Sequence, residues 1–320
     1  MVSLIIPCFN GEKFIDRCIS SILNQTYKNI ELIFINDGSI DDTEKIIMKN
    51  KSKIEENLSS FKYIKKSNGG PASAVNEGLK YVTGKFLALL DVDDYLLEDS
   101  IFIRRKFLLE NKDYDIVRTN GYIVNEGNLD EIIDIFITRK EEKNKEYIFD
   151  DLIEGKTNNW SGSYMVRISK LFEFYSNKKI YESKYGQNLQ LLLPLAYEKK
   201  VGFIDVPLMK YINQQVSLSK HNGDFEKQKN ALLGYKDIRV NVIMQICKGD
   251  ELKKYLDKIE VLYARHLIEL AFYYRNKELM NSNFEILRRY KSDTIEDKIL
   301  YYNLNNKIIE IILRLKKKIM

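Results

Sequence analysis

The chain has 320 residues, which is long for one compact core and fits two domains. Its 51 Lys and Arg residues against 46 Asp and Glu leave a net charge of +5, too weak an excess to indicate a nucleic-acid partner. We therefore expect a two-domain protein that binds no nucleic acid.

The first hundred residues alternate between two patterns. Apolar runs typical of buried strands are followed by segments whose apolar residues recur at helical spacing. This alternation predicts an α/β fold with a mainly parallel, doubly wound sheet and helices on both faces. The predicted strands cover residues 2–6, 30–35, 61–64 and 86–90, and the predicted helices cover 14–23, a segment that begins near Asp41, and 72–81.

Polar residues follow three of these strands, at Pro7 to Asn10, Asn36 to Ser39 and Asp91 to Asp94. In doubly wound sheets, ligands bind beyond the carboxyl ends of the strands. We therefore expect the three polar segments to converge on one ligand-binding edge.

The acids Asp91, Asp93 and Asp94 come directly after an apolar strand. Carboxylate oxygens suit Mg²⁺ or Mn²⁺, and either ion can bridge a diphosphate. A solvated acidic loop is the alternative interpretation of this short motif.

Two residues at the same edge suit a nucleotide. Asp37 has a carboxylate that can accept the imide N–H of a uracil or anchor a ribose, although an Asp before Gly also forms turns. Phe9 stands beside backbone amides at a helix start, which suits base stacking and phosphate binding. Packing in the core is the alternative for Phe9.

From about Phe225 the pattern changes to long helical segments, which predicts a helical accessory domain. We expect residues 1–222 to form the α/β domain and residues 223–320 to form the helical domain. The α/β domain would consist of two halves, about 1–100 and 101–222. The helical domain is a candidate for homo-oligomer formation. The basic end at Lys316 to Lys318 suits an anionic membrane surface or a partner helix, or else simply solvent.

The expected compartment is reducing. Cys8, Cys18 and Cys247 form no C-x-x-C pair and lie in stretches that resemble core, so we expect reduced, buried thiols. The chain opens on a strand-like run without a signal-peptide pattern, and no segment has the roughly 18 consecutive apolar residues of a membrane span. We expect a cytoplasmic protein, with peripheral contact at the inner face of the membrane as an option.

Taken together, the ordered motifs resemble the large family-two inverting glycosyltransferases. Each motif is short, but their order and spacing match over about the first hundred residues. The segments 207–211 and 217–219 resemble the closing part of the same family. The motifs are Ile6-Pro-Cys-Phe-Asn10, Gln25-Thr-Tyr27, Ile35-Asn-Asp-Gly-Ser39, Asn68-Gly-Gly-Pro71, Asn76-Glu-Gly78 and Leu90-Asp-Val-Asp-Asp94.

This resemblance implies a GT-A fold and transfer of a sugar from a nucleotide diphosphate, commonly a UDP-sugar, to a glycan, lipid-linked saccharide or glycoprotein. It also implies a divalent ion, Mn²⁺ or Mg²⁺, held by Asp91 and Asp93, with His221 as a further contact in some relatives. The implied donor-binding residues are Pro7, Cys8, Phe9, Asn10, Asp37, Asn68, Gly69, Asn76, Asp91 and Val92.

The chain departs from this family at two places. Relatives supply the catalytic base from a Glu-Asp pair, whereas Gln187 and Asn188 stand here and neither amide takes up a proton. The nearest carboxylate is Glu182. Many relatives also place a donor-binding arginine where this chain has Val75, and that change removes a strong charge-assisted partner of the diphosphate.

Two functional interpretations follow. The first is an active subgroup with its own base, which we favour because Asp37, Asp91 and Asp93 are retained. The second is a noncatalytic, sugar-nucleotide-binding partner subunit of another glycosyltransferase. A nucleotidyltransferase on a similar sheet is disfavoured by the pairing of Asn-Asp-Gly-Ser with D-x-D-D. Trp160 is either a sugar-stacking platform or a packing residue.

Overall fold

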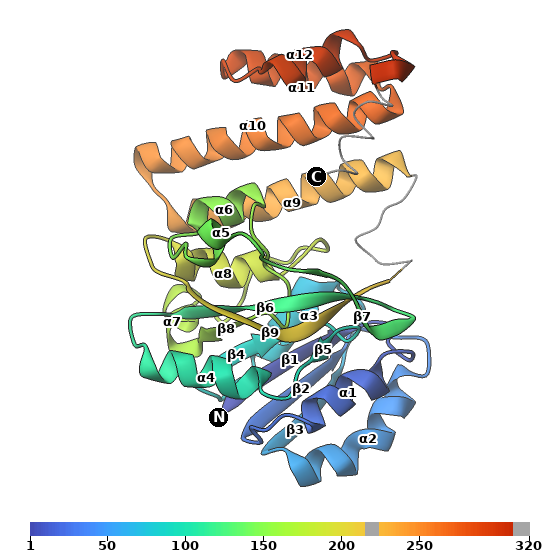
Figure 1. The fold of residues 1–320 in the computed structure, drawn as a ribbon, viewed down its shortest axis with the longest axis vertical. Helices are drawn as coiled ribbons and strands as arrows, with labels where there is room; N and C mark the ends of the chain where they lie inside the picture. Colours follow the sequence, from blue (N-terminus) through green and yellow to red (C-terminus); the bar gives the residue numbers. More distant parts are fainter. Residues whose placement is uncertain (215–223, 310–320) are drawn as a thin grey trace. The chain divides into compact units, whose positions relative to one another are not determined.

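The computed structural model describes residues 1–214 and 224–309. The chain divides into two compact units, residues 1–216 and 217–320. The first is an α/β unit and the second is helical (Figure 1). The division falls within the segment 215–223, which lies outside the described residues and contains the predicted boundary at residue 222.

Within residues 1–214 the strands form one nine-stranded sheet in the order β3-β2-β1-β4-β8-β6-β9-β5, and β7 pairs with β6. Six of these strands run in one direction, whereas β5, β7 and β8 run in the other. The strands are β1 (Val2–Cys8), β2 (Ile30–Asn36), β3 (Ser60–Lys65), β4 (Phe86–Leu89), β5 (Tyr95–Leu96), β6 (Ile116–Asn125), β7 (Asn128–Ile135), β8 (Tyr164–Arg167) and β9 (Gly202–Asn213).

β1, β2 and β4 are buried on both faces, whereas β3, at the edge of the sheet, is partly exposed. On β1, Leu4 and Ile6 pack in the core cluster that includes buried residues of α1, α2 and α4. Ile5 points to the opposite face, where a Cβ on Gly78 of α3 would lie 2.8 Å from it. Glycine at this position therefore lets α3 approach the sheet closely.

Helices cover both faces of this sheet, with α1, α2 and α4 on one face and α3 and α8 on the other (Figure 1). The expected α/β fold, with helices on both faces of a mainly parallel sheet, is confirmed. The helices are α1 (Ile15–Leu23), α2 (Thr43–Asn57), α3 (Pro71–Leu79), α4 (Ser100–Glu110), α5 (Lys140–Lys143), α6 (Phe149–Glu154), α7 (Ile168–Phe174) and α8 (Asn188–Ala196).

The second unit consists, among its described residues, of α9 (Phe225–Ile246), α10 (Gly249–Tyr274), α11 (Lys277–Arg289) and α12 (Ile295–Tyr302). Ile268, Phe272 and Phe284 are among the buried residues of its core. A capping box between Thr294 and Asp297 begins α12.

The thiols of Cys8, Cys18 and Cys247 are buried and in no disulfide, as the sequence predicts. No helix among the described residues is long and apolar enough to cross a membrane. The basic end at Lys316 to Lys318 lies outside the described residues.

Candidate functional site

The polar segments predicted to form the site do meet at one edge of the sheet. β1 pairs in parallel with β2, and their register places Cys8 beside Asn36. β1 also pairs in parallel with β4 on its other side. Phe9, Asp37 and Asp91 therefore all follow strand ends at the carboxyl edge, where α/β sheets bind ligands.

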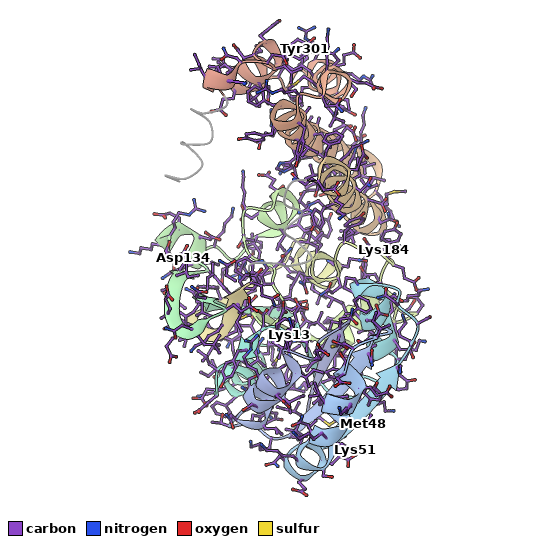
Figure 2. The ribbon with its side chains drawn as sticks, turned by 90° about the vertical axis from the view of Figure 1, so that its right-hand side faces the viewer. Lys13, Met48, Lys51, Asp134, Lys184 and Tyr301 are labelled. Carbon is purple, nitrogen blue, oxygen red and sulfur yellow. The ribbon has the colours of Figure 1, made fainter. Side chains whose placement is uncertain are left out.

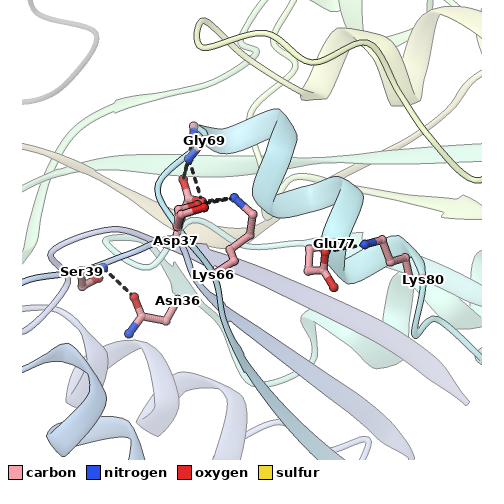
Figure 3. A network of polar contacts seen from close by, with 9 residues as sticks. Asn36, Asp37, Ser39, Lys66, Gly69, Glu77 and Lys80 are labelled. Carbon is pink, nitrogen blue, oxygen red and sulfur yellow. Dashed lines mark hydrogen bonds and ion pairs between the residues drawn. The ribbon is translucent and has the colours of Figure 1, made fainter.

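Asp37 organises the glycine-rich turn at this edge (Figure 3). Its Oδ1 accepts hydrogen bonds from Lys66 Nζ at 2.7 Å and from the Gly69 N–H at 3.1 Å. Its Oδ2 accepts the Gly70 N–H at 2.8 Å. Asp37 is 3% exposed, so these charge-assisted bonds hold the turn that opens α3.

The neighbouring Asn36 and Gly38 fix the shape of the same edge. Asn36 Oδ1 accepts the Ser39 N–H at 2.8 Å, and its Nδ2 donates to the Tyr63 hydroxyl at 2.9 Å. Gly38 has φ +79°, and a Cβ there would lie 2.7 Å from the Asn68 nitrogen. Only glycine fits this contact.

The segment after β1 packs against the turn after β2. The Asn10 N–H donates to Ser39 Oγ at 2.9 Å, and Asn10 Oδ1 accepts the Ile40 N–H at 3.0 Å. Phe9 is 43% exposed, so its ring does not pack in the core. An exposed ring at this edge is available to stack on a ligand.

Cys8 has a packing role at the same edge. Burial raises the pKa of its thiol to about 12, so it stays protonated at neutral pH. A Cβ at Gly11 would lie 2.4 Å from Cys8 Sγ, so the loop folds tightly over the sulfur.

The three acids after β4 have different surroundings. Asp94 is 2% exposed, and its Oδ1 accepts the Ile212 N–H of β9 at 3.2 Å. Asp93 Oδ2 accepts a hydrogen bond from Gln214 Nε2 at 2.8 Å. Asp91 and Asp93 retain partial exposure, whereas Asp94 anchors the loop to the sheet.

The protonated forms of these acids are favoured. Burial and, to a smaller extent, the nearby Asp93 charge raise the pKa of Asp91 to about 7, against a hydrogen bond from Ser161 that lowers it. Burial also raises the pKa of Asp93 and of Asp94. A cation bound between Asp91 and Asp93 would favour their ionised forms and so lower both pKa values again.

Asp91 and Asp93 suit a divalent ion that a substrate helps to hold. Among residues 1–214 and 224–309 there is no group of three or more His, Cys, Asp or Glu that could enclose a metal by itself. Mg²⁺ commonly binds one or two carboxylates together with substrate phosphates. The two carboxylates of Asp91 and Asp93 match that number. His221, the third predicted ligand, lies outside the described residues.

A buried polar network links Asp91 to the predicted acceptor stretch. The Ser161 hydroxyl has two acceptors within reach for its one proton, the Asp91 carboxylate and Asn188 Oδ1 at 3.0 Å, and its Oγ accepts from Gln187 Nε2 at 3.4 Å. The Tyr164 hydroxyl donates to Asn188 Oδ1 at 2.7 Å. The fold thus joins the acids after β4 to the two amides that begin α8.

Other predicted residues have structural partners. Both polar atoms of the Asn76 side chain bond to Ile180: Nδ2 donates to the Ile180 carbonyl at 3.0 Å, and Oδ1 accepts the Ile180 N–H at 2.9 Å. Glu182 is exposed and forms an ion pair with Lys179 at 3.0 Å, which lowers the pKa of the Glu182 carboxyl. Val75 is fully buried, so a long charged side chain would not fit there without rearrangement.

Trp160 is a packing residue with partial exposure. Its ring stacks on Tyr211 at 4.7 Å between centroids and meets the Phe136 edge at 4.4 Å. These contacts support the packing role and leave the sugar-stacking role as a prediction, because the residue is only half-buried.

Sequence reasoning missed Ser161, Tyr164, Lys66 and Gln214 as members of the site. Ser161 directly follows Trp160, and Lys66 precedes the Asn68-Gly-Gly turn by two residues, so both stand close to recognised positions. The partners of Tyr164 and Gln214 are distant in sequence: Asn188 is 24 residues from Tyr164 and Asp93 is 121 residues from Gln214. No local pattern identifies such pairs.

Comparisons with known proteins show the family of this chain. A family model described as "Glycosyl transferase family 2" matches residues 3–179. The chain belongs to this family. Its motifs after β1, β2 and β4 lie within the matched region, so the predicted family membership is confirmed.

Curated relatives match parts of the chain. A glycosyltransferase, GlyA, of Streptococcus pneumoniae is 28% identical over 80% of this chain and 36% of its own length. A chondroitin synthase of Pasteurella multocida is 37% identical over 40% of this chain and 13% of its own. An uncharacterized glycosyltransferase of Rickettsia bellii is 41% identical over 34% of this chain and 15% of its own length. The matches thus span a small part of these family members.

Solved structures share the fold over nearly the whole chain. S. aureus TarS 1–349 in complex with UDP-GlcNAc has a TM-score of 0.62 at 15% identity and covers 97% of this chain and 91% of its own. The mannosyltransferase PcManGT from Pyrobaculum calidifontis, in complex with GDP-Man and Mn²⁺, has a TM-score of 0.56 at 14% identity and covers 94% of this chain and 78% of its own. The predicted GT-A fold is confirmed.

Proposed function

We propose that this chain transfers a sugar from a nucleotide diphosphate donor, a UDP-sugar, to a hydroxyl group of a glycan, lipid-linked saccharide or glycoprotein, with inversion. The observation that carries the proposal is the hydrogen-bonded network from Asp91 through Ser161 to Gln187 and Asn188. This network supports the proposal because it joins Asp91, a predicted metal ligand, to the stretch that the family resemblance implies for the acceptor. Family membership supports the reaction class.

The donor half has the parts that a nucleotide requires. The exposed Phe9 ring offers a stacking surface for a base, and Asp37 fixes the turn that opens α3 by accepting the Gly69 and Gly70 N–H groups. The UDP-GlcNAc bound to TarS and the GDP-Man and Mn²⁺ bound to PcManGT support a nucleotide-sugar donor and a divalent ion here.

When bound, Mn²⁺ or Mg²⁺ would offset the charge that develops on the departing diphosphate, with Asp91 and Asp93 as its protein ligands. Gln187 and Asn188 orient the acceptor hydroxyl, because amides donate and accept hydrogen bonds without taking up protons. We assign the proton acceptor to Glu182, the carboxylate nearest to Gln187 in the sequence. Its ion pair with Lys179 lowers its pKa, so it is ionised at neutral pH and becomes a stronger base when that pair opens.

Titration calorimetry with UDP, UDP-glucose, UDP-galactose and UDP-N-acetylglucosamine, with and without Mn²⁺, tests the donor site. Wild type is expected to bind UDP in a Mn²⁺-dependent manner. Asp93→Ala is expected to weaken this binding by about tenfold or more, because a diphosphate-bridged ion loses a charged ligand. Asp113→Ala, which removes an exposed carboxylate outside the site, is the matched control.

Absence of UDP binding by the wild type, or equal binding by Asp93→Ala, would contradict the donor assignment. Donor binding without release of UDP in the presence of acceptors favours the second candidate, a noncatalytic partner subunit. The observation behind that candidate is the replacement of the expected Glu-Asp pair by Gln187 and Asn188. Such a subunit should still stabilise an active enzyme when it carries Glu182→Gln.

A further inference from the structure

The helical unit contains a pocket of its own, with a volume of about 560 Å³. It lies between the first part of α11 and the end of α12 with the turn that follows. Its size falls within the range of small-molecule sites, roughly 300–1,000 Å³. The lining residues are Lys277, Met280, Asn281, Tyr301, Tyr302 and 303–306.

The chemistry of these walls is polar but almost uncharged. Among the described residues, four asparagines and two tyrosines line the pocket, and Lys277 is the one charged lining residue, although 30% of the chain is charged. An amide both donates and accepts hydrogen bonds, as a sugar hydroxyl does. A tyrosine ring adds an apolar face that can cover the C–H face of a sugar.

The aromatic part of the pocket is anchored to the core. The Tyr301 ring stacks on Phe284 with centroids 4.1 Å apart and planes at 15°, and Figure 2 places Tyr301 in the helical unit. Tyr302 meets Tyr301 edge-on at 5.2 Å and is 69% exposed. One tyrosine is therefore fixed by packing, while its neighbour presents most of its surface to solvent.

The amide part is also ordered by local bonds. Asn303 Nδ2 donates to the Ile299 carbonyl at 2.9 Å, and Asn306 Nδ2 donates to Asn303 Oδ1 at 3.3 Å. Asn306 Oδ1 accepts the Ile308 N–H at 3.0 Å. Because the turn is held in place before a ligand arrives, binding there costs less ordering entropy.

We propose that this pocket binds a neutral oligosaccharide and is a saccharide site separate from the transfer site of the α/β unit. Among the described lining residues Lys277 is the sole cation, which disfavours anionic ligands, and a purely apolar ligand would not use the hydrogen-bonding groups of the asparagines. The role that follows, retention of a glycan acceptor between transfers, rests on the proposed function. The binding itself does not.

Saturation-transfer NMR on the full chain tests the site with maltohexaose, cellohexaose and chitohexaose as probes. At least one probe is expected to bind. Tyr302→Ala is expected to lower its affinity about fivefold or more, because a stacking surface is removed. Asn281→Ala should lower it as well, and both residues are exposed, so folding is expected to survive. Tyr147→Ala, at a 58% exposed tyrosine of the α/β unit, is the matched control.

The proposal is overturned if none of the three probes binds, or if Tyr302→Ala and Asn281→Ala bind as the wild type does. Loss of the signal in Asp93→Ala or on addition of UDP with Mn²⁺ would also overturn it, because the probe would then occupy the transfer site. Probe binding that persists in Asp93→Ala supports the pocket even where the donor titration fails. The two hypotheses therefore fail separately.

Discussion

At the scale of single residues, the side chain that takes the acceptor's proton is the sharpest open question. Glu182→Gln keeps the size of the side chain and removes its basicity, so we expect the transfer rate to fall by about 10²–10⁴-fold while UDP affinity stays unchanged. The measurement is UDP release under saturating donor and acceptor, together with calorimetry.

Glu173→Gln is a close control for this prediction. Glu173 also forms an exposed ion pair with a lysine three residues away, Lys170, as Glu182 does with Lys179. Both variants lose a surface ion pair, which contributes little to stability. A rate that falls equally in both variants would remove Glu182 from the mechanism.

At the scale of elements, Arg104 joins α4 to β8. This fully buried side chain donates from Nη1 to the carbonyls of Gly162 and Tyr164 at 2.9 and 2.7 Å, and from Nε to the Ser100 carbonyl at 3.0 Å. Burial lowers the pKa of Arg104 to about 9. Arg104 thereby holds the backbone beside Ser161, the hub of the polar network.

We expect Arg104→Met to lower the free energy of unfolding by about 2–4 kcal/mol, because buried carbonyl groups lose their donors. Urea denaturation gives this value. Lys106→Met, on the same helix but exposed, should change stability by no more than about 0.5 kcal/mol. Should the two variants be equally stable, the carbonyl contacts of Arg104 would be energetically unimportant.

At the scale of the whole molecule, the acids after β4 make stability depend on pH and on metal. The unfolded state loses the Asp91 proton near the ordinary pKa of 3.8, whereas the folded state holds it until about pH 7. The folded state thus binds more protons between these values, and stability falls as pH rises through them. A shift of this size corresponds to at most about 4 kcal/mol.

Thermal unfolding between pH 5 and 9, with and without Mn²⁺, checks this expectation. Without metal, Asp91→Asn should gain stability relative to wild type as pH rises toward 7 and hold that gain above it. Mn²⁺ should stabilise wild type most above pH 7, where the carboxylates are ionised, and should have little effect on the variant. Parallel pH profiles of the two proteins would contradict the raised pKa.

The sequence by itself determined the α/β fold, the family and the edge where the site lies. These follow from local patterns, because buried strands need apolar runs and the turns after them need glycine, asparagine or aspartate, as Gly38 illustrates with its positive φ. Phe9, Asp37 and Asp91 belong to such turns, so they were recognisable in advance.

Only the tertiary structure decided which side chains meet. Asp91 contacts Ser161, 70 residues later, and through it Asn188, while Asp37 was expected to face a nucleotide and holds Gly69 and Gly70. The exposed pocket beside Tyr302 likewise depends on how α11 and α12 pack. Such contacts join residues far apart in the chain, and their geometry is set by sheet order and helix packing, which no local pattern encodes.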